Sequence, residues 1–108
     1  FDLAFRKCLR RALPERKLER AGPENALFRM PNPVKRAGVT PALAAEAKAA
    51  TIEPRLETVA IDGHFAVIYS RFGLAGGWEM SPDPYAFGYD QRSAMKLGQN
   101  ILMYAITQ

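Results

Sequence analysis

The sequence of 108 residues contains one cysteine, Cys8, and one histidine, His64. A single cysteine excludes a disulfide within the chain. The two residues are also too few for a zinc site of the Cys/His type built from this chain alone, and we expect no metal and no cofactor. The longest apolar runs, residues 65–69 and 101–106, are much shorter than the ~20 residues that a membrane-spanning helix needs. We therefore expect no membrane span in this chain.

Acidic residues are scarce in the first third of the chain. Residues 1–36 hold ten Lys or Arg against four Asp or Glu, whereas residues 37–108 hold five against seven. The net charge of +4 is therefore concentrated in a basic segment, residues 6–20. This segment either meets an anionic partner or surface, or is the solvated face of a helix. Its first cationic side chains are Arg6, Lys7, Arg10 and Arg11. The alternating aromatic residues Tyr85, Phe87 and Tyr89 lie far from this basic segment in the sequence. Because single-stranded nucleic acid is bound by basic and aromatic side chains together, we expect no specific nucleic-acid binding.

The composition is that of one small globular domain, with 48% hydrophobic and 24% charged residues. Helical spacing of apolar residues predicts a helix over residues 1–13, which Pro14 ends. Cys8 falls on the apolar stripe of this helix, so we expect it in the core. The connecting chain that follows contains at most a short strand at residues 17–20. Leu27 and Phe28 are predicted to anchor this connection to a core.

Residues 31–55 are rich in proline and alanine and are predicted to form a loop with a short helix. The helix is expected at residues 41–50, because the segment has high helix propensity. Thr40 is a fitting N-cap and Pro41 a fitting first-turn residue.

A β-hairpin is predicted at residues 56–70, where two strand-like runs flank Asp62 and Gly63. The first run is mixed in polarity, as on a sheet edge. The second is apolar throughout, as in a strand covered on both faces. Such a strand needs layers above and below it. Because the sequence also starts at Phe1, inside a predicted helix, we expect a fragment or a processed chain with further sequence upstream.

The last predicted element is a helix at residues 90–107, capped by Asp90. Its apolar face is predicted from helical spacing, and Gly98 within it is expected to allow close approach to the sheet. The face comprises Ala94, Leu97, Gly98, Ile101, Leu102 and Ala105.

The candidate site lies where the second hairpin strand ends in a glycine-rich loop, a place where α/β proteins bind ligands. Its predicted lining residues are Ser70, Arg71, Gly73, Gly76, Gly77, Trp78 and Glu79. Ser70 lacks the G-x-S-x-G setting of a nucleophile and is predicted to be a hydrogen-bonding residue. It also lies a strand length of ~20 Å from His64, so the two cannot form a dyad. Trp78 either stacks on a ligand or covers the end of the core.

The order of these motifs resembles that of the bacterial domain-of-unknown-function family 4159. The matching elements are Leu13-Pro14, Leu27-Phe28, Asp62-Gly63, the strand at 66–70, the loop at 73–79 and the helix at 98–107. The resemblance implies an α/β, flavodoxin-like three-layer sandwich similar to class I glutamine amidotransferases, of which this chain is the C-terminal half. Residues 31–55 do not fit the family pattern, which implies that they are an insertion or loop with a short helix. It carries over no catalytic residue, because the family has no established activity. Members commonly occur in envelope-associated or secreted proteins, which implies the cell envelope or periplasm.

Three functional hypotheses follow. The first is a ligand- or protein-binding module without demonstrable catalysis, whose partner is the missing N-terminal half or another protein chain. The second is a hydrolase or amidotransferase-type enzyme whose nucleophile lies upstream of Phe1. The third is binding to an anionic surface through residues 6–20.

Overall fold

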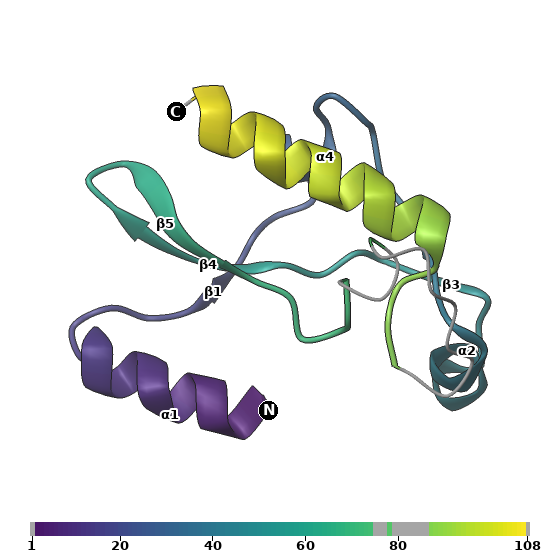
Figure 1. Ribbon diagram of the computed structural model, residues 1–108, viewed down its shortest axis with the longest axis horizontal. Helices are drawn as coiled ribbons and strands as arrows, with labels where there is room; N and C mark the ends of the chain where they lie inside the picture. Colours follow the sequence, from purple (N-terminus) through teal and green to yellow (C-terminus); the bar gives the residue numbers. More distant parts are fainter. Residues whose placement is uncertain (1, 75–77, 79–86, 108) are drawn as a thin grey trace.

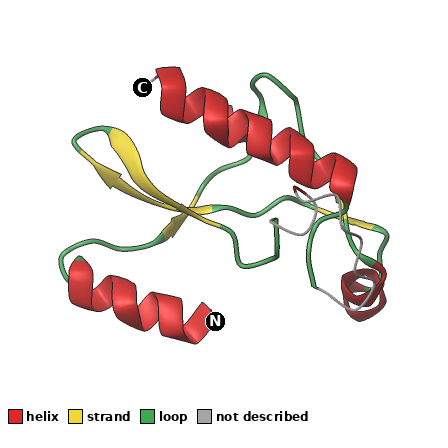
Figure 2. Ribbon diagram, viewed as in Figure 1, coloured by secondary structure: helices red, strands yellow, loops and turns green. Residues whose placement is uncertain are grey.

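The computed structural model describes residues 2–74, 78 and 87–107, and these residues form an α/β structure with two small antiparallel sheets (Figures 1 and 2). The strands β1, β4 and β5 form the larger sheet in that order, and β2 and β3 form the smaller one. In chain order the elements are α1 (Asp2–Ala12), β1 (Glu19–Arg20), the 3-10 helix η1 (Ala26–Phe28), β2 (Ala37–Gly38), α2 (Pro41–Ala47), β3 (Thr51–Ile52), β4 (Glu57–Ile61), β5 (His64–Tyr69) and α4 (Gln91–Thr107).

The predicted hairpin is confirmed. Its turn consists of Asp62 and Gly63, whose φ angles of 54° and 81° are the positive values that a tight hairpin turn requires. Aspartate tolerates this conformation better than most residues and glycine adopts it freely, so the local sequence is sufficient to define the turn.

The prediction of which hairpin strand lies at the edge was wrong. Within the part of the chain that the structure describes, β4 is the central strand, paired with both β1 and β5, whereas β5 is an outer strand. Glu57 and Thr58 of β4 are buried because each has a polar partner: Glu57 contacts two arginines, and the Thr58 hydroxyl donates to the Glu19 carbonyl at 3.3 Å. Mixed polarity in this strand therefore reflects internal pairing and not exposure to solvent.

An irregularity in β5 places Phe65 and Tyr69, which are four residues apart, on opposite faces of the sheet. The register shifts between Val59 and Ala60, which leaves Ala66 without a partner on β4. Such a bulge reverses the alternation of side chains along a strand. Phe65 therefore stacks on Tyr104 of α4, with ring centroids 5.1 Å apart. Tyr69, four residues on, stacks on Phe5 of α1 at 4.3 Å.

The hairpin thus lies between two helices, with α4 on one side and α1 on the other (Figure 1). The main core fills the α4 side. Its buried members are Ala21, Leu27, Phe28, Val34, Ala37, Leu56, Leu74, Tyr89, Ala94 and Leu97. The predicted anchoring role of Leu27 and Phe28 is confirmed, since both are almost fully buried. Residues 31–55, predicted as an insertion or loop, contribute Val34 and Ala37 to this core.

The helix α4 begins as predicted, because the Asp90 carboxylate accepts a hydrogen bond from the Ser93 amide at 2.8 Å. Its apolar face is only partly buried: Ala94 and Leu97 are inaccessible, whereas Leu102 is 60% exposed. No helix in the described part of the chain is long and apolar enough to cross a membrane.

The helix α1 lies against the sheet without burying any side chain completely. Cys8 is exposed, so its predicted place in the core was wrong. The face that α1 turns toward the sheet includes Asp2 and Arg6, which contact Tyr69 and Glu57. These polar contacts rotate the helix away from the orientation that its apolar stripe alone predicts.

Candidate functional site

The predicted site begins at the carboxyl end of β5 with Ser70. The Ser70 hydroxyl donates a hydrogen bond of 2.6 Å to the Phe72 carbonyl, so it fixes the chain as it leaves the strand. His64 is at the other end of β5 and is exposed. The structure therefore brings no base to Ser70 from the one histidine of the chain. Of the other predicted site residues, Arg71 is exposed, and Gly76, Gly77 and Glu79 lie outside the described residues.

Gly73 forms a close backbone contact rather than part of an open loop. Its amide donates to the Phe87 carbonyl and its carbonyl accepts from the Tyr89 amide, both at 3.0 Å. The facing glycine is Gly88, where a Cβ atom would lie only 2.6 Å from the Gly73 carbonyl oxygen. The two glycines therefore allow two segments of backbone to meet in an isolated parallel bridge.

Trp78 covers the helix α4 without being buried. Its side chain is 44% exposed, and its indole N–H donates to the Ala94 carbonyl at 2.6 Å. A Cβ atom on Gly98 would lie 2.7 Å from the indole nitrogen. We expected Gly98 to allow approach to the sheet, but what comes close to it is this indole ring.

A cluster of charged and phenolic side chains, the polar cluster, lies between α1 and the sheet. The Arg6 guanidinium contacts the Glu57 carboxylate at 2.6 Å and the Asp2 carboxylate at 3.1 Å. The Tyr69 hydroxyl donates to Asp2 at 2.6 Å, and Arg55 contacts Glu57 at 3.2 Å. Sequence reasoning missed this cluster. The spacing of four residues between Asp2 and Arg6 is a local signal for one of its ion pairs.

The electrostatics of the polar cluster hold Asp2 and Tyr69 in unreactive forms. The hydrogen bond from Tyr69 lowers the pKa of Asp2, so this carboxylate stays ionised. Desolvation, and then the hydrogen bond to Asp2, raise the pKa of Tyr69 to about 12. A carboxylate with a lowered pKa and a phenol with a raised pKa are poor proton carriers at neutral pH. They are suited to holding α1 on the sheet.

The high pKa of Tyr69 leads to a titration experiment. A phenol that titrates higher in the folded state than in the unfolded state stabilises the fold below the unfolded pKa of about 10. This contribution is lost as the pH rises through the folded pKa of about 12. We expect phenolate absorbance to show a step near that pH which Tyr69→Phe removes. A Tyr104→Phe variant is the control and should keep the step. If the step persists in Tyr69→Phe, its assignment to Tyr69 is wrong.

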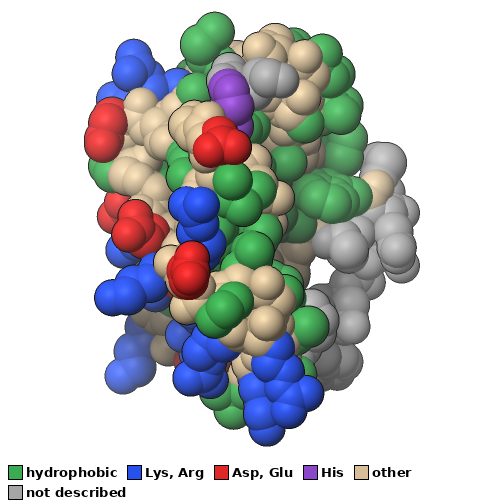
Figure 3. Space-filling view, turned by 90° about the vertical axis from the view of Figure 1, so that its left-hand side faces the viewer, with side chains coloured by type: hydrophobic (Ala, Val, Ile, Leu, Met, Phe, Trp, Pro, Cys, Tyr) green, Lys and Arg blue, Asp and Glu red, His purple; other side chains and the backbone are tan. Residues whose placement is uncertain are grey.

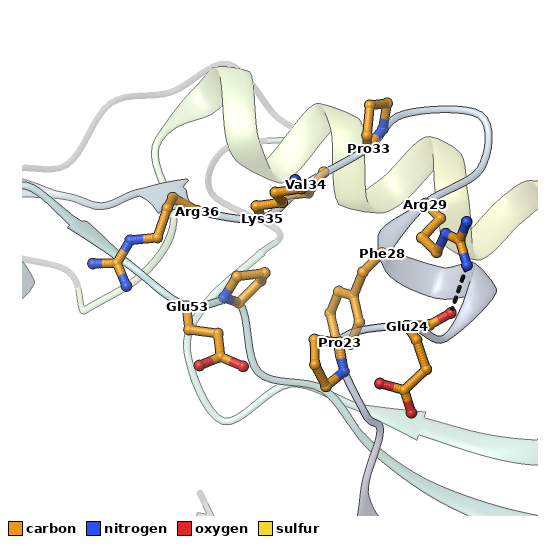
Figure 4. A pocket seen from close by; sticks show the side chains of 10 residues that line it. Pro23, Glu24, Phe28, Arg29, Pro33, Val34, Lys35, Arg36 and Glu53 are labelled. Atoms are coloured by element: carbon orange, nitrogen blue, oxygen red, sulfur yellow. Dashed lines mark hydrogen bonds between the residues drawn. The ribbon is translucent and has the colours of Figure 1, made fainter.

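The grooves that the described residues form on the surface include one between η1 and β3 and one between β5 and α4. The larger, of about 750 Å³, lies between η1 and β3 (Figure 4). Its apolar floor includes Phe28 and Val34, and at its rim the Arg29 guanidinium contacts the Glu24 carbonyl. The smaller, of about 510 Å³, lies between β5 and the end of α4. It is lined by His64, Phe65, Ala66, Ile68, Tyr104 and Ala105, so neither groove is lined by a predicted site residue.

No group of three or more His, Cys, Asp or Glu side chains that could hold a metal ion occurs within residues 2–74, 78 and 87–107. The charged side chains of the polar cluster alternate between cations and anions. The Nε atom of Arg55 is buried and has no hydrogen-bond partner among the described residues.

Residues 1–106 match the family model described as Domain of unknown function (DUF4159). The chain belongs to this family. It has no significant match among the curated proteins or the solved structures. The resemblance drawn from the hairpin and the last helix is thereby confirmed at the level of the family. The family description assigns no activity, so the surfaces and side chains of this DUF4159 chain are what indicate its function.

Proposed function

We propose that this DUF4159 chain is a protein-binding module whose larger sheet is continued by a strand from another polypeptide segment. The observation that carries the proposal is the position of β5. Its side chains contact α4 on one face and α1 on the other, through Phe65 and Tyr69, yet it is an outer strand. Strands that are covered on both faces have near-continuous apolar sequences, and β5 has such a sequence although no strand lies beside its outer edge among the described residues.

The edge of β5 has few of the features that keep an outer strand from pairing. Natural edge strands are often protected by lysine, proline or inward-pointing charges. The sequence HFAVIY contains no Lys, Arg, Asp, Glu or Pro, and its one irregularity is the bulge at Ala66. The Phe65 amide donates to the Tyr104 hydroxyl at 2.8 Å, so strand addition would begin beyond it. Main-chain hydrogen bonds to an added strand would supply affinity, and side chains on either face would supply specificity.

The arrangement of helix, sheet and helix also supports an architecture for the whole domain. We propose a flavodoxin-like, class I glutamine amidotransferase-like sandwich, of which this chain forms the C-terminal half. Strand pairing within the described sheets is antiparallel, so the parallel strands of such a fold would have to be those that add at β5. The added segment is then either the N-terminal half of the domain or another protein chain.

Binding is favoured over catalysis by the chemistry at the end of β5. The Ser70 hydroxyl is engaged with a carbonyl, and the acids of the polar cluster are paired with arginines. A hydrolase or amidotransferase-type enzyme would need its nucleophile and base from the added segment. The described side chains would then position that segment.

The proposal can be tested with peptides selected from a random library for binding to the chain. We expect selected peptides to alternate β-branched or aromatic residues, as added strands do. Ala66→Glu, at an exposed position of β5, should weaken their binding by about tenfold or more, because it places a charge against the added strand. Fluorescence anisotropy with a labelled peptide measures this change.

The matched control is Ala60→Glu, which adds the same charge at an exposed position of β4, inside the sheet. Its affinity for the peptides should stay close to that of the unaltered chain. Equal loss in both variants, or peptides that bind equally well to Ala66→Glu, would refute binding at the β5 edge. Circular dichroism of both variants verifies that they are folded.

A further inference from the structure

The surface around the edge of β5 indicates which strand adds there. We infer that β5 pairs with β5 of a second copy of this chain, so that two three-stranded sheets join across a two-fold axis. This inference rests on the proposed function, since it names the partner for the same edge. Of the two occupants proposed there it takes another protein chain, which excludes the N-terminal half of a flavodoxin-like domain from that edge. It requires that the surface be complementary to itself, because an isologous interface brings the same patch together twice.

The first supporting observation is the distribution of charge. Neither β5 nor residues 97–107 of α4 contain Lys, Arg, Asp or Glu, although the chain carries a net charge of +4. Figure 3 faces this end of the molecule: one acidic side chain lies directly below the histidine and hydrophobic side chains lie further below and to the right of it, whereas Lys, Arg, Asp and Glu side chains lie along the left of the view and many Lys and Arg side chains gather at the lower end. A charged partner would find no complementary charges on the strand or the helix end. A second copy brings an uncharged surface to an uncharged surface and opposes no like charges there.

The second observation is that the same surface carries both a groove and a ridge. The groove between β5 and α4 has a volume of about 510 Å³, and Ala66 and Ala105 are among its lining residues. Beside it, Leu102 and Ile106 of α4 are 60% and 70% exposed. Residues 102, 105 and 106 lie on one face of a helix because they are spaced by three and four positions. The ridge of one copy can therefore enter the groove of the other.

The third observation is strand direction. The larger sheet is antiparallel throughout, and a two-fold axis perpendicular to a sheet sets two copies of its outer strand antiparallel. The joined sheet of six strands would then be antiparallel throughout, from β1 of one copy to β1 of the other. Both copies of α4 would lie on the same face, so the exposed Leu102 side chains would meet above the seam.

Analytical ultracentrifugation of the chain over a range of about 5 to 500 µM tests the inference, because self-association depends on concentration. We expect the mass to rise from 12.0 kDa toward twice that value. Ala66→Glu on the strand and Leu102→Glu on the ridge should each raise the dissociation constant by about tenfold or more. Because the surface is uncharged, changing the salt concentration should alter the association little.

Two matched variants keep the test specific. Ala60→Glu lies on the neighbouring strand and Met95→Glu on the first half of α4, both at exposed positions, and both should associate like the unaltered chain. A chain that stays at 12.0 kDa throughout overturns the inference. If library peptides still bind such a monomer at β5, the proposed function stands with a different partner. A dimer that persists in both Ala66→Glu and Leu102→Glu uses another surface and also overturns the inference.

Discussion

Replacing Asn100 with leucine is expected to lower the free energy of unfolding by about 3 kcal/mol, because it leaves buried polar groups without partners. Asn100 is 1% exposed, and its amide nitrogen donates to the carbonyls of Leu27 and Asn32 at 2.9 and 2.8 Å. Its oxygen accepts from the Asn32 amide at 2.9 Å. One side chain thus joins α4 to η1 and to the turn after it. Urea denaturation followed by circular dichroism measures the loss.

Two further variants show whether the loss comes from the buried hydrogen bonds of Asn100. One changes a neighbouring residue and the other changes Asn100 itself. Gln99→Ala removes an exposed partner of the Asn32 side chain and should cost less than about 1 kcal/mol. Asn100→Asp places a carboxylate against two carbonyls, so the folded-state pKa of the new acid should exceed its unfolded value of about 3.9. Its stability should therefore recover as the pH falls, since the protonated acid can donate one bond. A loss in Asn100→Asp that is independent of pH would contradict this account.

The parts of the fold that could be predicted are those determined by neighbouring residues. Asp62 and Gly63 define the hairpin turn by their own conformational preferences, and Asp90 caps α4 through an amide three residues away. The helical spacing that places Leu97 in the core is likewise a local pattern. Such features need no knowledge of the rest of the chain.

The parts that sequence reasoning missed depend on distant partners. Glu57 is buried because Arg6, 51 positions earlier, neutralises it, so the polarity of β4 gave no measure of its exposure. Cys8 is exposed because polar contacts determine which face of α1 meets the sheet. Asn100 differs, since it lies three positions after the buried Leu97 on the same helical face. That spacing is a signal for a buried polar residue that could have been found.

The predicted positions of two candidate site residues in the fold are confirmed, whereas ligand binding by them stays a prediction. Ser70 and Gly73 lie at the end of β5 as expected, but both are engaged with backbone groups. The polar cluster beside them could not be predicted, since it combines residues from α1, β4 and β5 that are far apart in the sequence. The sequence shows β5 as a run of apolar residues. Apolar character alone, however, does not distinguish a central strand from an outer strand, so the open edge of β5 could not be predicted.

The second large effect is expected for Glu57→Gln, which should cost about 2–4 kcal/mol because it leaves two guanidinium groups facing a neutral amide. Arg6 and Arg55 both contact this carboxylate, whose side chain is only 7% exposed, whereas the arginines are about a third or more exposed and keep some contact with water. The effect should be strongest in α1. Hydrogen exchange followed by mass spectrometry should show faster exchange throughout residues 2–12, since an isolated helix of this length is marginal in water.

Glu53→Gln provides the comparison for that prediction. Glu53 contacts Arg20 at 3.5 Å with both side chains about half exposed, so its loss should cost less than about 1 kcal/mol and leave exchange in α1 unchanged. If Glu57→Gln loosens α1 while β5 keeps its slow exchange, the helix is held by the polar cluster and the sheet stands without it. If β5 loosens as well, the α1 layer is needed to keep the outer strand in place. The edge proposed for binding would then exist only while Asp2, Arg6 and Glu57 hold that layer together.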